Sequence, residues 1–461
     1  MLKLSIAEVA GAVGAEIHSS AGRAGAAVPA GYSIDTRTMT AGDLFFALEG
    51  ERSDGHRFVR EAAARGASGA VVAHEVEGLD PSFVQVVVES PLAALQRLAV
   101  HVRGLVDIPV IAVTGSNGKT TTKEMIAAVL SPSRNVHRNP GNFNNQIGVP
   151  LTILGLDDAA EVLITELGSN HMGEIEELAS WVRPDVAVIT NVGRAHIGLF
   201  GSFENVVREK TSLLRVLPPS GRGVVNADSP AVLQKAEEID IDTVTYGIEA
   251  DCDFRATDIE ITARPGSIFR VGSTRVTLRV PGVHNIYNAL AAIAAGTIFD
   301  VGPEEAARAL GDFEPVRVAV SREGGVTVID DTYNANPDSI RAVMGVLMSF
   351  PADRRVFVMG EMLELGDFSK ELHREVGAGV ADAGADYFFG VGGAVWDAVD
   401  AARGAGMAED RAGYFADKET ACAFLSRFIK PGDTILVKGS RATGMDAVSG
   451  YILKEAALRR K

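Results

Sequence analysis

The chain has 461 residues, of which 46% are hydrophobic and 23% are charged, and its formal net charge is −16 at pH 7. This length predicts about three domains with ordinary globular cores. The negative charge argues against a broad nucleic-acid interface, so any anionic ligand must be held by local positive groups.

Cysteine usage and the start of the chain bear on the compartment. The two cysteines, Cys252 and Cys422, are far apart in the sequence and form no metal-ligand spacing, which fits a reducing environment. The N-terminal stretch lacks the continuous apolar core of a signal peptide, and no apolar run is long enough to span a bilayer. We therefore expect a soluble, cytoplasmic protein without membrane insertion.

The first hundred residues alternate short helical and strand patterns. Residues Asp54–Ala64 predict a helix, and Gly69–Ala73 and Phe83–Val88 predict strands. Apolar residues at helical spacing between 92 and 102 mark one face of a further helix. Because Pro109 follows a polar break, we place a domain boundary near residue 107.

The rest of the chain repeats a strand-then-helix pattern, with a second break at residues 311–315. Its strands are continuous apolar runs, which suit a parallel sheet covered on both faces. These strands are Val110–Val113, Val162–Glu166, Val186–Thr190, Val326–Ile329, Val356–Met359, Tyr387–Gly390 and Thr434–Val437. The sequence thus predicts three α/β domains, at residues 1–107, 108–313 and 314–461, with ligands at the carboxyl ends of the strands.

A glycine-rich turn follows the first strand of the second domain, in the stretch IAVTGSNGKTTTK from Ile111 to Lys123. Backbone N–H groups of such a turn face phosphate oxygens, and the following helix adds its dipole. Lys119 would neutralise the phosphates, and the Thr120 hydroxyl would bind Mg²⁺. Gly115 and Gly118 are closer than in the common phosphate loop, and the alternative is an ordinary strand-to-helix turn. The residues predicted to hold the nucleotide here are Gly115, Ser116, Asn117, Gly118, Lys119, Thr120 and Thr121.

The compact form of this loop resembles that of the Mur ligases, which build the peptide of the bacterial cell wall. Further strings along most of the chain are similar to the same family. They lie at residues 33–37 (SIDTR), 42–50 (GDLFFALEG), 54–56 (DGH), 139–150 (NPGNFNNQIGVP), 284–292 (HNIYNALAA), 330–339 (DDTYNANPDS), 359–366 (MGEMLELG) and 437–441 (VKGSR). The resemblance implies a UDP-substrate domain, a central domain of the phosphate-loop ATPase type and a Rossmann-like C-terminal domain.

The resemblance also implies the reaction. ATP would phosphorylate a substrate carboxylate, giving an acyl phosphate and ADP, and an amine would then displace phosphate. Within the family, the DDTYNANP and GEMLELG strings point to the member that joins D-alanyl-D-alanine to UDP-N-acetylmuramoyl-tripeptide (UDP-MurNAc-tripeptide), acting as a monomer. The third residue of the tripeptide, lysine or diaminopimelate, stays open.

Three residues are implied to complete the catalytic centre around Lys119. Glu166 ends an apolar strand, where a carboxylate suits Mg²⁺; the alternative is a strand-end acid that faces solvent. His196 matches the family histidine that holds a second Mg²⁺, although a lone histidine is more often a surface or core residue. Lys210 matches the family lysine that reacts with CO₂ to give an anionic carbamate, and the alternative is an exposed helix lysine.

Other residues are implied to bind ATP and the substrates. His284, Asn285 and Asn288 would lie at the adenine side, although Asn285 could instead cap its helix. Arg317 would reach the nucleotide, and Asp331 would bind the ribose. The remaining substrate-binding residues implied are Asn334 and Asn336, which would face ATP or the dipeptide, and Ser33, Thr36 and Arg37, which would bind UDP. For Asn334 and Asn336 the alternative is a loop rich in turn-forming residues. For the three residues of the first domain it is a surface loop.

Because these residues come from different domains, we expect the active site between domains, with the C-terminal domain moving inward when ligands bind. Two other functions stay open at this point. One is a related amide ligase, either a tripeptide-stage Mur ligase or a folylpolyglutamate synthase. The other is a phosphate-loop switch without ligase activity, which would have no use for a carbamate lysine.

Overall fold

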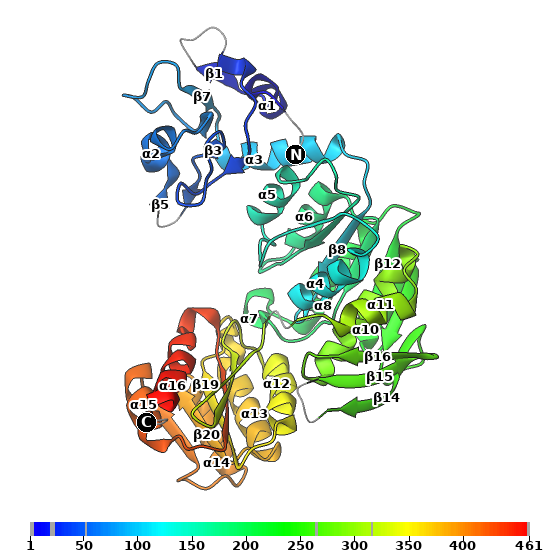
Figure 1. Ribbon diagram of the computed structural model, residues 1–461, viewed down its shortest axis with the longest axis vertical. Coiled ribbons are helices and arrows are strands. Elements are labelled where there is room, and N and C mark those ends of the chain that lie inside the picture. The colour runs from blue at the N-terminus through cyan, green and yellow to red at the C-terminus, as the bar shows by residue number, and fades with distance from the viewer. Residues whose placement is uncertain (1–3, 19–23, 51–52, 263–265, 315–316, 459–461) are drawn as a thin grey trace.

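Three large sheets follow one another along the chain in the computed structural model, which describes residues 4–18, 24–50, 53–262, 266–314 and 317–458, and a two-stranded sheet accompanies the first of them. The N-terminal and C-terminal units lie at opposite ends of the long axis, and the middle unit joins them (Figure 1). This agrees with the predicted three-unit α/β architecture. In the described part of the chain, no helix is both long enough and apolar enough to cross a membrane.

The N-terminal unit is a five-stranded sheet in the order β1-β7-β6-β3-β2, in which β1 pairs antiparallel and the other neighbours are parallel. Ser5 precedes its first helix and caps it, because the side chains of Ser5 and Glu8 form a capping box. The elements are α1 (Ile6–Val13), β1 (Glu16–His18), β2 (Tyr32–Ser33), β3 (Leu44–Phe46), the hairpin β4 (Glu49–Gly50) and β5 (Ser53–Asp54), α2 (Val59–Ala64), β6 (Gly69–Val72), β7 (Val84–Val87) and α3 (Pro91–Gly104), with 3₁₀ turns at Ala24–Ala26 and Gly55–Phe58.

The helix predicted over Asp54–Ala64 is wrong in its first half. Asp54 ends a short strand, and its carboxylate accepts a hydrogen bond from the His56 backbone N–H at 2.9 Å, so it caps a 3₁₀ turn. Gly55 packs so close to the backbone that an added Cβ would lie 2.6 Å from Leu48 N. The α-helix therefore begins only at Val59. The local side-chain cap competes with regular helix at this point.

The middle unit is a nine-stranded sheet in the order β16-β15-β14-β13-β12-β11-β8-β10-β9. Strand β8 lies inside the sheet, between β11 and β10. Its side chains alternate between two separate cores, so that Ile111 and Val113 enter one core and Val110 and Ala112 the other. Burial on both faces explains why the strand is continuously apolar. The elements are β8 (Val110–Thr114), α4 (Lys119–Leu130), β9 (Val136–Arg138), α5 (Gly148–Leu154), β10 (Val162–Glu166), α6 (Glu174–Val182), β11 (Val186–Ile189), α7 (Ile197–Phe200), α8 (Phe203–Arg215), β12 (Arg222–Asn226), α9 (Pro230–Ile239), β13 (Asp242–Gly247), β14 (Phe254–Ile261), β15 (Ser267–Val271), β16 (Thr274–Leu278), α10 (Val283–Ile298) and α11 (Pro303–Gly311).

The three strands β14, β15 and β16 were not predicted. Strand β14 pairs parallel with β13, and β15 and β16 then extend the sheet by antiparallel pairing. Buried residues alternate with more exposed ones along β15 and β16. A one-sided strand carries half the apolar signal of a fully buried one, so the strand-then-helix pattern did not reveal this edge.

The C-terminal unit is a six-stranded sheet in the order β17-β18-β22-β19-β20-β21, parallel except for the β17–β18 pair. Its elements are β17 (Ala319–Glu323), β18 (Val326–Asp331), α12 (Pro337–Ser349), β19 (Arg354–Gly360), α13 (Ser369–Asp382), β20 (Tyr387–Val391), α14 (Val395–Gly404), β21 (Ala412–Phe415), α15 (Lys418–Phe428), β22 (Asp433–Lys438) and α16 (Asp446–Leu458), with 3₁₀ turns at Gly366–Phe368 and Arg441–Thr443. The four strands predicted here are confirmed as β18, β19, β20 and β22.

The predicted domain boundaries fall between α3 and β8 and between α11 and β17. The second predicted break, at residues 311–315, ends at a residue that lies outside the described part of the chain. Both boundaries stay predictions.

A buried arginine ties α3 to the middle unit. The Arg103 guanidinium donates to the carbonyls of Val182 (2.7 Å), Val106 (2.6 Å), Ile108 (3.3 Å) and Arg183 (3.4 Å). Because two of these carbonyls belong to the linker after α3 and two to the end of α6, Arg103 fixes the linker against the middle sheet.

Replacing Arg103 with alanine is expected to lower the free energy of unfolding by about 2 to 4 kcal/mol, because four carbonyls lose a charged donor. Urea denaturation would measure the loss. Arg97→Ala is the matched control on the same helix, since Arg97 makes a single long bond, 3.5 Å from the Val13 carbonyl. An equal loss in the two variants would contradict the special role of Arg103.

Candidate active site

The phosphate loop connects β8 to α4, as predicted. Gly118 precedes the helix with φ of 79° and Gly115 has φ of 146°, backbone conformations that L side chains rarely adopt. A Cβ at Gly118 would also collide with the Asn288 side chain, and one at Gly115 with Thr190. Both glycines are therefore required by the shape of the turn.

Lys119 lies at the first position of α4 and folds back over the loop. Its Nζ donates to the carbonyl oxygens of Gly115 (2.8 Å) and Ser116 (3.3 Å). Burial lowers the pKa of Lys119, the Glu166 carboxylate opposes the shift, and the positive charge of Arg317 adds to it. The two carbonyl dipoles therefore hold the Lys119 ammonium where the phosphates of a bound nucleotide would lie against the loop.

Glu166 ends β10 and is buried, with 1% of its surface exposed, so the alternative of a solvent-facing acid is wrong. The Thr120 hydroxyl donates to Oε2 at 2.7 Å, and the Asn144 amide donates to Oε1 at 2.7 Å. Arg317 from the C-terminal unit donates to Thr120 Oγ1 at 2.6 Å. The cluster of carboxylate, hydroxyl and amide oxygens is the donor set that Mg²⁺ prefers.

The loop that brings Asn144 to Glu166 is held from beneath. Lys123 is fully buried, and its Nζ donates to the carbonyls of Asn139 (2.6 Å) and Gly141 (3.1 Å). The Asn139 side chain accepts from the Glu166 backbone N–H at 2.8 Å. Residues 139–150 were singled out by resemblance, but only the structure assigns these supporting contacts.

His196 and Lys210 lie on neighbouring segments. His196 precedes α7 with φ of 58°, and its Nδ1 contacts the carboxylate of Glu364 from the C-terminal unit. That contact lowers the pKa of Glu364. Among the described residues, no hydrogen bond or ion pair joins His196 to Lys210 or to Glu166.

Lys210 is buried in α8, with 2% of its surface exposed, so the alternative of an exposed helix lysine is wrong. Its Nζ donates to Ser169 Oγ at 2.8 Å and lies 5.6 Å from the centre of the Phe200 ring. Burial lowers the pKa of Lys210 to about 7, and the positive charge of Lys119 adds to the shift. A large fraction of the amine is therefore uncharged near neutral pH.

The asparagines of α10 form a chain that leads to α4. Asn288 accepts from the Thr122 hydroxyl at 3.1 Å and donates to Asn285 Oδ1 at 2.9 Å, and Asn285 donates to the Pro281 carbonyl at 2.7 Å. Gly282, not Asn285, is the residue that precedes the helix, so the capping alternative is wrong. Burial, with a contribution from the charge of Lys438, lowers the pKa of His284 to about 4, so its ring is neutral at physiological pH.

The C-terminal unit presents residues from the carboxyl ends of β18 and β22. Lys438 Nζ donates to Asp331 Oδ2 at 2.6 Å and to the Asn334 carbonyl at 2.7 Å. Burial raises the pKa of Asp331, and the Lys438 charge opposes the rise. Lys438 belongs to the VKGSR string, which the sequence analysis quoted without giving this lysine a role.

Arg317 also stacks on Tyr333, with its Cζ 3.3 Å from the ring centre. Replacing Tyr333 with leucine is expected to raise KM for ATP about ten-fold, because the cation–π contact holds Arg317 toward Thr120. Tyr333→Phe keeps the ring and is expected to stay within about two-fold of the parent. Steady-state kinetics with varied ATP measures both, and equal effects in the two variants would contradict the stacking role.

Most of the predicted nucleotide, metal and substrate residues meet in one cavity of about 760 Å³ between the middle and C-terminal units. Its lining includes Ser116, Asn117, Gly118, Lys119, Thr120, Thr121, Glu166, His196, His284, Asn285, Asn288, Arg317, Asp331, Asn334 and Asn336, together with Asn144, Ser169, Tyr333 and Lys438, which sequence reasoning did not assign. Lys210 lies behind this lining, against Ser169.

Ser33, Thr36 and Arg37 do not line this cavity. Ser33 and Thr36 are buried in the N-terminal unit, and Arg37 is exposed. The Arg37 guanidinium donates to the Asp35 carboxylate from Nε, at 2.9 and 3.1 Å, and from Nη2, at 2.6 Å, and the contact lowers the pKa of Asp35 to about 2.

The fold and this cavity define a nucleotide-binding enzyme whose phosphate loop faces carboxylate and amide groups from a second unit. Three family descriptions match successive parts of the chain: "Mur ligase family, catalytic domain" at residues 30–109, "Mur ligase middle domain" at 113–296 and "Mur ligase, glutamate ligase domain" at 316–441. Proteins named UDP-N-acetylmuramoyl-tripeptide–D-alanyl-D-alanine ligase are 38% identical in Synechocystis sp., covering 91% of both chains, and 35% identical in Bacillus subtilis, covering 91% of this chain and 92% of the relative.

Solved structures agree with these relatives. MurF from Acinetobacter baumannii superposes with a TM-score of 0.88 at 31% identity, over 98% of this chain and 99% of that one. MurF from Thermotoga maritima in complex with ADP gives 0.81 at 28% identity, over 93% and 98%. The chain belongs to the Mur ligase family. It is an ATP-dependent ligase that forms an amide bond.

Proposed function

We propose that this ligase joins D-alanyl-D-alanine to UDP-MurNAc-tripeptide and so produces UDP-MurNAc-pentapeptide for peptidoglycan synthesis. The relatives with this substrate pair in their name match nearly the whole chain. The observation that carries the chemistry is the shared cavity of Lys119 and Glu166 from the middle unit with Arg317 and Asp331 from the C-terminal unit.

The main obstacle to the reaction is charge, because a carboxylate must approach a triphosphate. Two unit charges 4 Å apart repel by about 4 kcal/mol at an effective dielectric constant near 20. Lys119 and Arg317 bring positive charge to the loop, and both side chains are held by hydrogen bonds within the protein. Groups that are fixed in this way need no reorganisation during the reaction.

Two bond exchanges complete the reaction. A carboxylate oxygen of the tripeptide attacks the γ-phosphorus of ATP, the bond to the β-phosphate oxygen breaks, and ADP leaves from the acyl phosphate. The uncharged amine of D-alanyl-D-alanine then attacks the carbonyl carbon, and phosphate leaves with the bridging oxygen. The nitrogen loses one proton, which the departing phosphate takes up, and the amide remains. Inward movement of the C-terminal unit over the cavity would keep water away from the acyl phosphate, which water would otherwise hydrolyse.

The residues around the loop fit Mg²⁺. Thr120, Glu166 and Asn144 offer oxygen atoms within one hydrogen-bonded cluster, and we assign the first ion to them. We assign a second ion to His196 and to Lys210 in its carbamylated form. When bound, Mg²⁺ neutralises developing charge on the transferred phosphoryl group.

Carbamylation of Lys210 is proposed on its surroundings as well as on the family resemblance. Its amine is buried beside the Ser169 hydroxyl and the positive charge of Lys119, and a buried ammonium is disfavoured there. A carbamate in its place carries negative charge, so it would accept from Ser169 and be attracted to Lys119. The exchange of sign removes an electrostatic conflict from the site.

The remaining assignments follow the cavity. We propose adenine contacts from His284, Asn285 and Asn288, ribose contacts from Asp331, and dipeptide or ATP contacts from Asn334 and Asn336. The UDP group would bind to the N-terminal unit at Ser33, Thr36 and Arg37, with Arg37 turning from Asp35 toward a phosphate. We propose a monomer that works in the cytoplasm, where ATP is available.

The proposed function is tested by measuring phosphate release from ATP in the presence of Mg²⁺, UDP-MurNAc-tripeptide and D-alanyl-D-alanine. Each substrate is then omitted in turn, and the mass of the product is determined by mass spectrometry. We expect a pentapeptide product that requires both substrates. ATP turnover without that product would move the assignment to another amide ligase of the family.

A further inference from the structure

One loop of the middle unit contacts both the phosphate loop and the C-terminal unit. This loop, residues 191–196, follows β11 and ends at His196. On one side, Asn191 accepts from the Asn117 backbone N–H and donates to the Asn117 carbonyl, both at 3.0 Å. Gly193 N–H donates to Ser116 Oγ at 2.9 Å. The loop and the phosphate loop therefore form one hydrogen-bonded unit.

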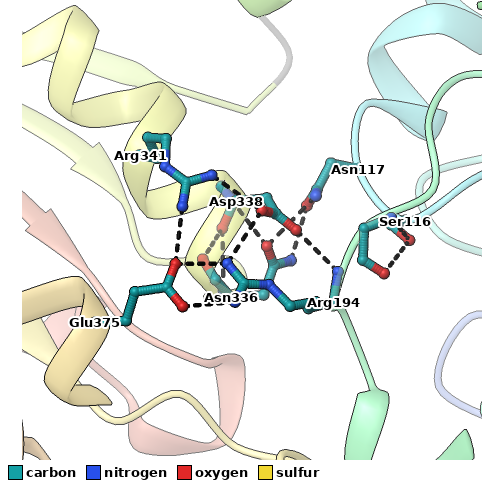
Figure 2. A network of polar contacts seen from close by, with 9 residues as sticks. Ser116, Asn117, Arg194, Asn336, Asp338, Arg341 and Glu375 are labelled. Carbon is teal, nitrogen blue, oxygen red and sulfur yellow. Dashed lines mark hydrogen bonds and ion pairs between the residues drawn. The ribbon is translucent and has the colours of Figure 1, made fainter. Parts of the chain in front are cut away.

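On its other side, the same loop is attached to α12 and α13. The Arg194 guanidinium makes two hydrogen bonds to the Glu375 carboxylate, both at 2.6 Å. The Arg194 backbone N–H donates to Asp338 Oδ2 at 2.9 Å. Arg341 lies next to these groups and donates to Glu375 at 2.9 Å and to Asp338 at 3.3 Å (Figure 2).

Backbone approach and a second polar pair support this contact. A Cβ at Gly193 would collide with the Asp338 carboxylate, so only glycine lets the loop come so near to α12. Asn336 donates to Asn117 Oδ1 at 2.8 Å and also caps α12, accepting from the Ser339 N–H at 2.9 Å. The start of α12 is therefore hydrogen-bonded directly to the phosphate loop.

We propose that Arg194, with Asp338 and Glu375, is the clamp that positions the C-terminal unit over the phosphate loop. None of the three is assigned to the substrates, so they are positioning residues. Arg317 and Asp331 come from the unit that the clamp holds, and their contact with the nucleotide depends on where that unit sits. The functional part of this proposal rests on the ligase activity proposed above.

The Arg194–Glu375 ion pair is expected to contribute more free energy than the other surface ion pairs. A single exposed ion pair contributes little, but a bidentate arginine in a network contributes more and fixes orientation. Arg194 and Glu375 side chains are 28% and 38% exposed, whereas Arg374 and Asp400, joined at 2.6 Å within the C-terminal unit, are 47% and 51% exposed. Arg374 is adjacent to Glu375 in α13 and provides a matched control that does not cross between units.

The test compares Arg194→Ala, Glu375→Ala, the double variant, Arg194→Lys and Arg374→Ala in the full chain. Ligase kinetics are measured with varied ATP. Unit spacing is measured by energy transfer between dyes at Lys235→Cys in α9 and Glu419→Cys in α15, with Cys252 and Cys422 replaced by serine. The dye measurement needs no ligase activity, so it tests the clamp even if the proposed function fails.

We expect each alanine variant to lower kcat/KM for ATP about ten-fold and to broaden the transfer distribution, with the double variant no worse than either single variant. Arg194→Lys keeps the charge without the two parallel bonds and should lie between. Arg374→Ala should match the parent in both measurements. The proposal is overturned if Arg194→Ala leaves the transfer distribution unchanged, or if Arg374→Ala changes it equally.

Discussion

Replacing Lys119 with methionine is expected to lower kcat/KM of the ligase reaction about a thousand-fold, while the protein stays folded. Methionine keeps most of the apolar stem of the lysine. It removes the positive charge that the phosphate loop carries at the first residue of α4. Loss of one fixed group that stabilises developing charge costs roughly a hundred- to a thousand-fold in rate. The loss should appear in kcat as well as in KM, because the charge is needed while the phosphoryl group moves.

Lys235→Met is the control for this experiment. Lys235 lies on α9 of the same unit, and among the described residues it pairs with Glu238, at 2.5 Å, and with no other acid. Its variant should keep parent activity and a parent melting temperature. A Lys119→Met enzyme that retains more than a tenth of parent activity would show that another group neutralises the phosphates.

The second large effect is expected at Lys210, where the sign of the charge can be tested. If Lys210 acts as a carbamate, both Lys210→Met and Lys210→Arg should lose about a hundred-fold in kcat, since neither can react with CO₂. If Lys210 acts as a cation, arginine should retain most of the activity. Lys210→Glu, which carries a carboxylate on a shorter stem, should exceed arginine only under the carbamate account.

Labelled bicarbonate gives a direct readout of the same question. The folded parent should show a carbamate signal that disappears in Lys210→Arg, and its activity should fall when CO₂ is removed from the buffer. Parent activity that is independent of CO₂, together with an active arginine variant, would contradict the carbamate account.

Much of this site could be predicted because its signals are local in the sequence. The phosphate loop is a short stretch in which strand, glycines and lysine occur in order, and the structure forms it as β8, turn and α4. The strand that ends at Glu166 and the one that ends at Asp331 were visible as apolar runs. The carboxyl ends of parallel strands gather ligands, which places both acids near the cavity.

What the sequence did not reveal depends on contacts between distant segments. Asn144 reaches Glu166 only because buried Lys123 holds the intervening loop, and no local pattern distinguishes Lys123 from a surface lysine. Tyr333 lies within the DDTYNANP string and received no role from the sequence, yet its ring supports Arg317 from another segment. The contact of Arg194 with Glu375 joins residues 181 positions apart, which periodicity cannot detect.

Burial also decided between alternatives that the sequence left open. Glu166 and Lys210 each had an ordinary surface interpretation, and both are buried beside polar partners instead. A buried ionisable group requires compensation, so its partners identify what it can bind. Asn285 likewise does not cap α10, because Gly282 is the residue that precedes the helix.

The central claim is that ATP activates the tripeptide carboxylate through an acyl phosphate, and heavy-oxygen labelling tests it most directly. The terminal carboxylate of UDP-MurNAc-tripeptide is labelled in both oxygens, and the phosphate released during amide formation is analysed by mass spectrometry. The account predicts one labelled oxygen in each phosphate and one in the new amide. Unlabelled phosphate alongside the pentapeptide would contradict it, because the carboxylate oxygen would then never have been bonded to phosphorus.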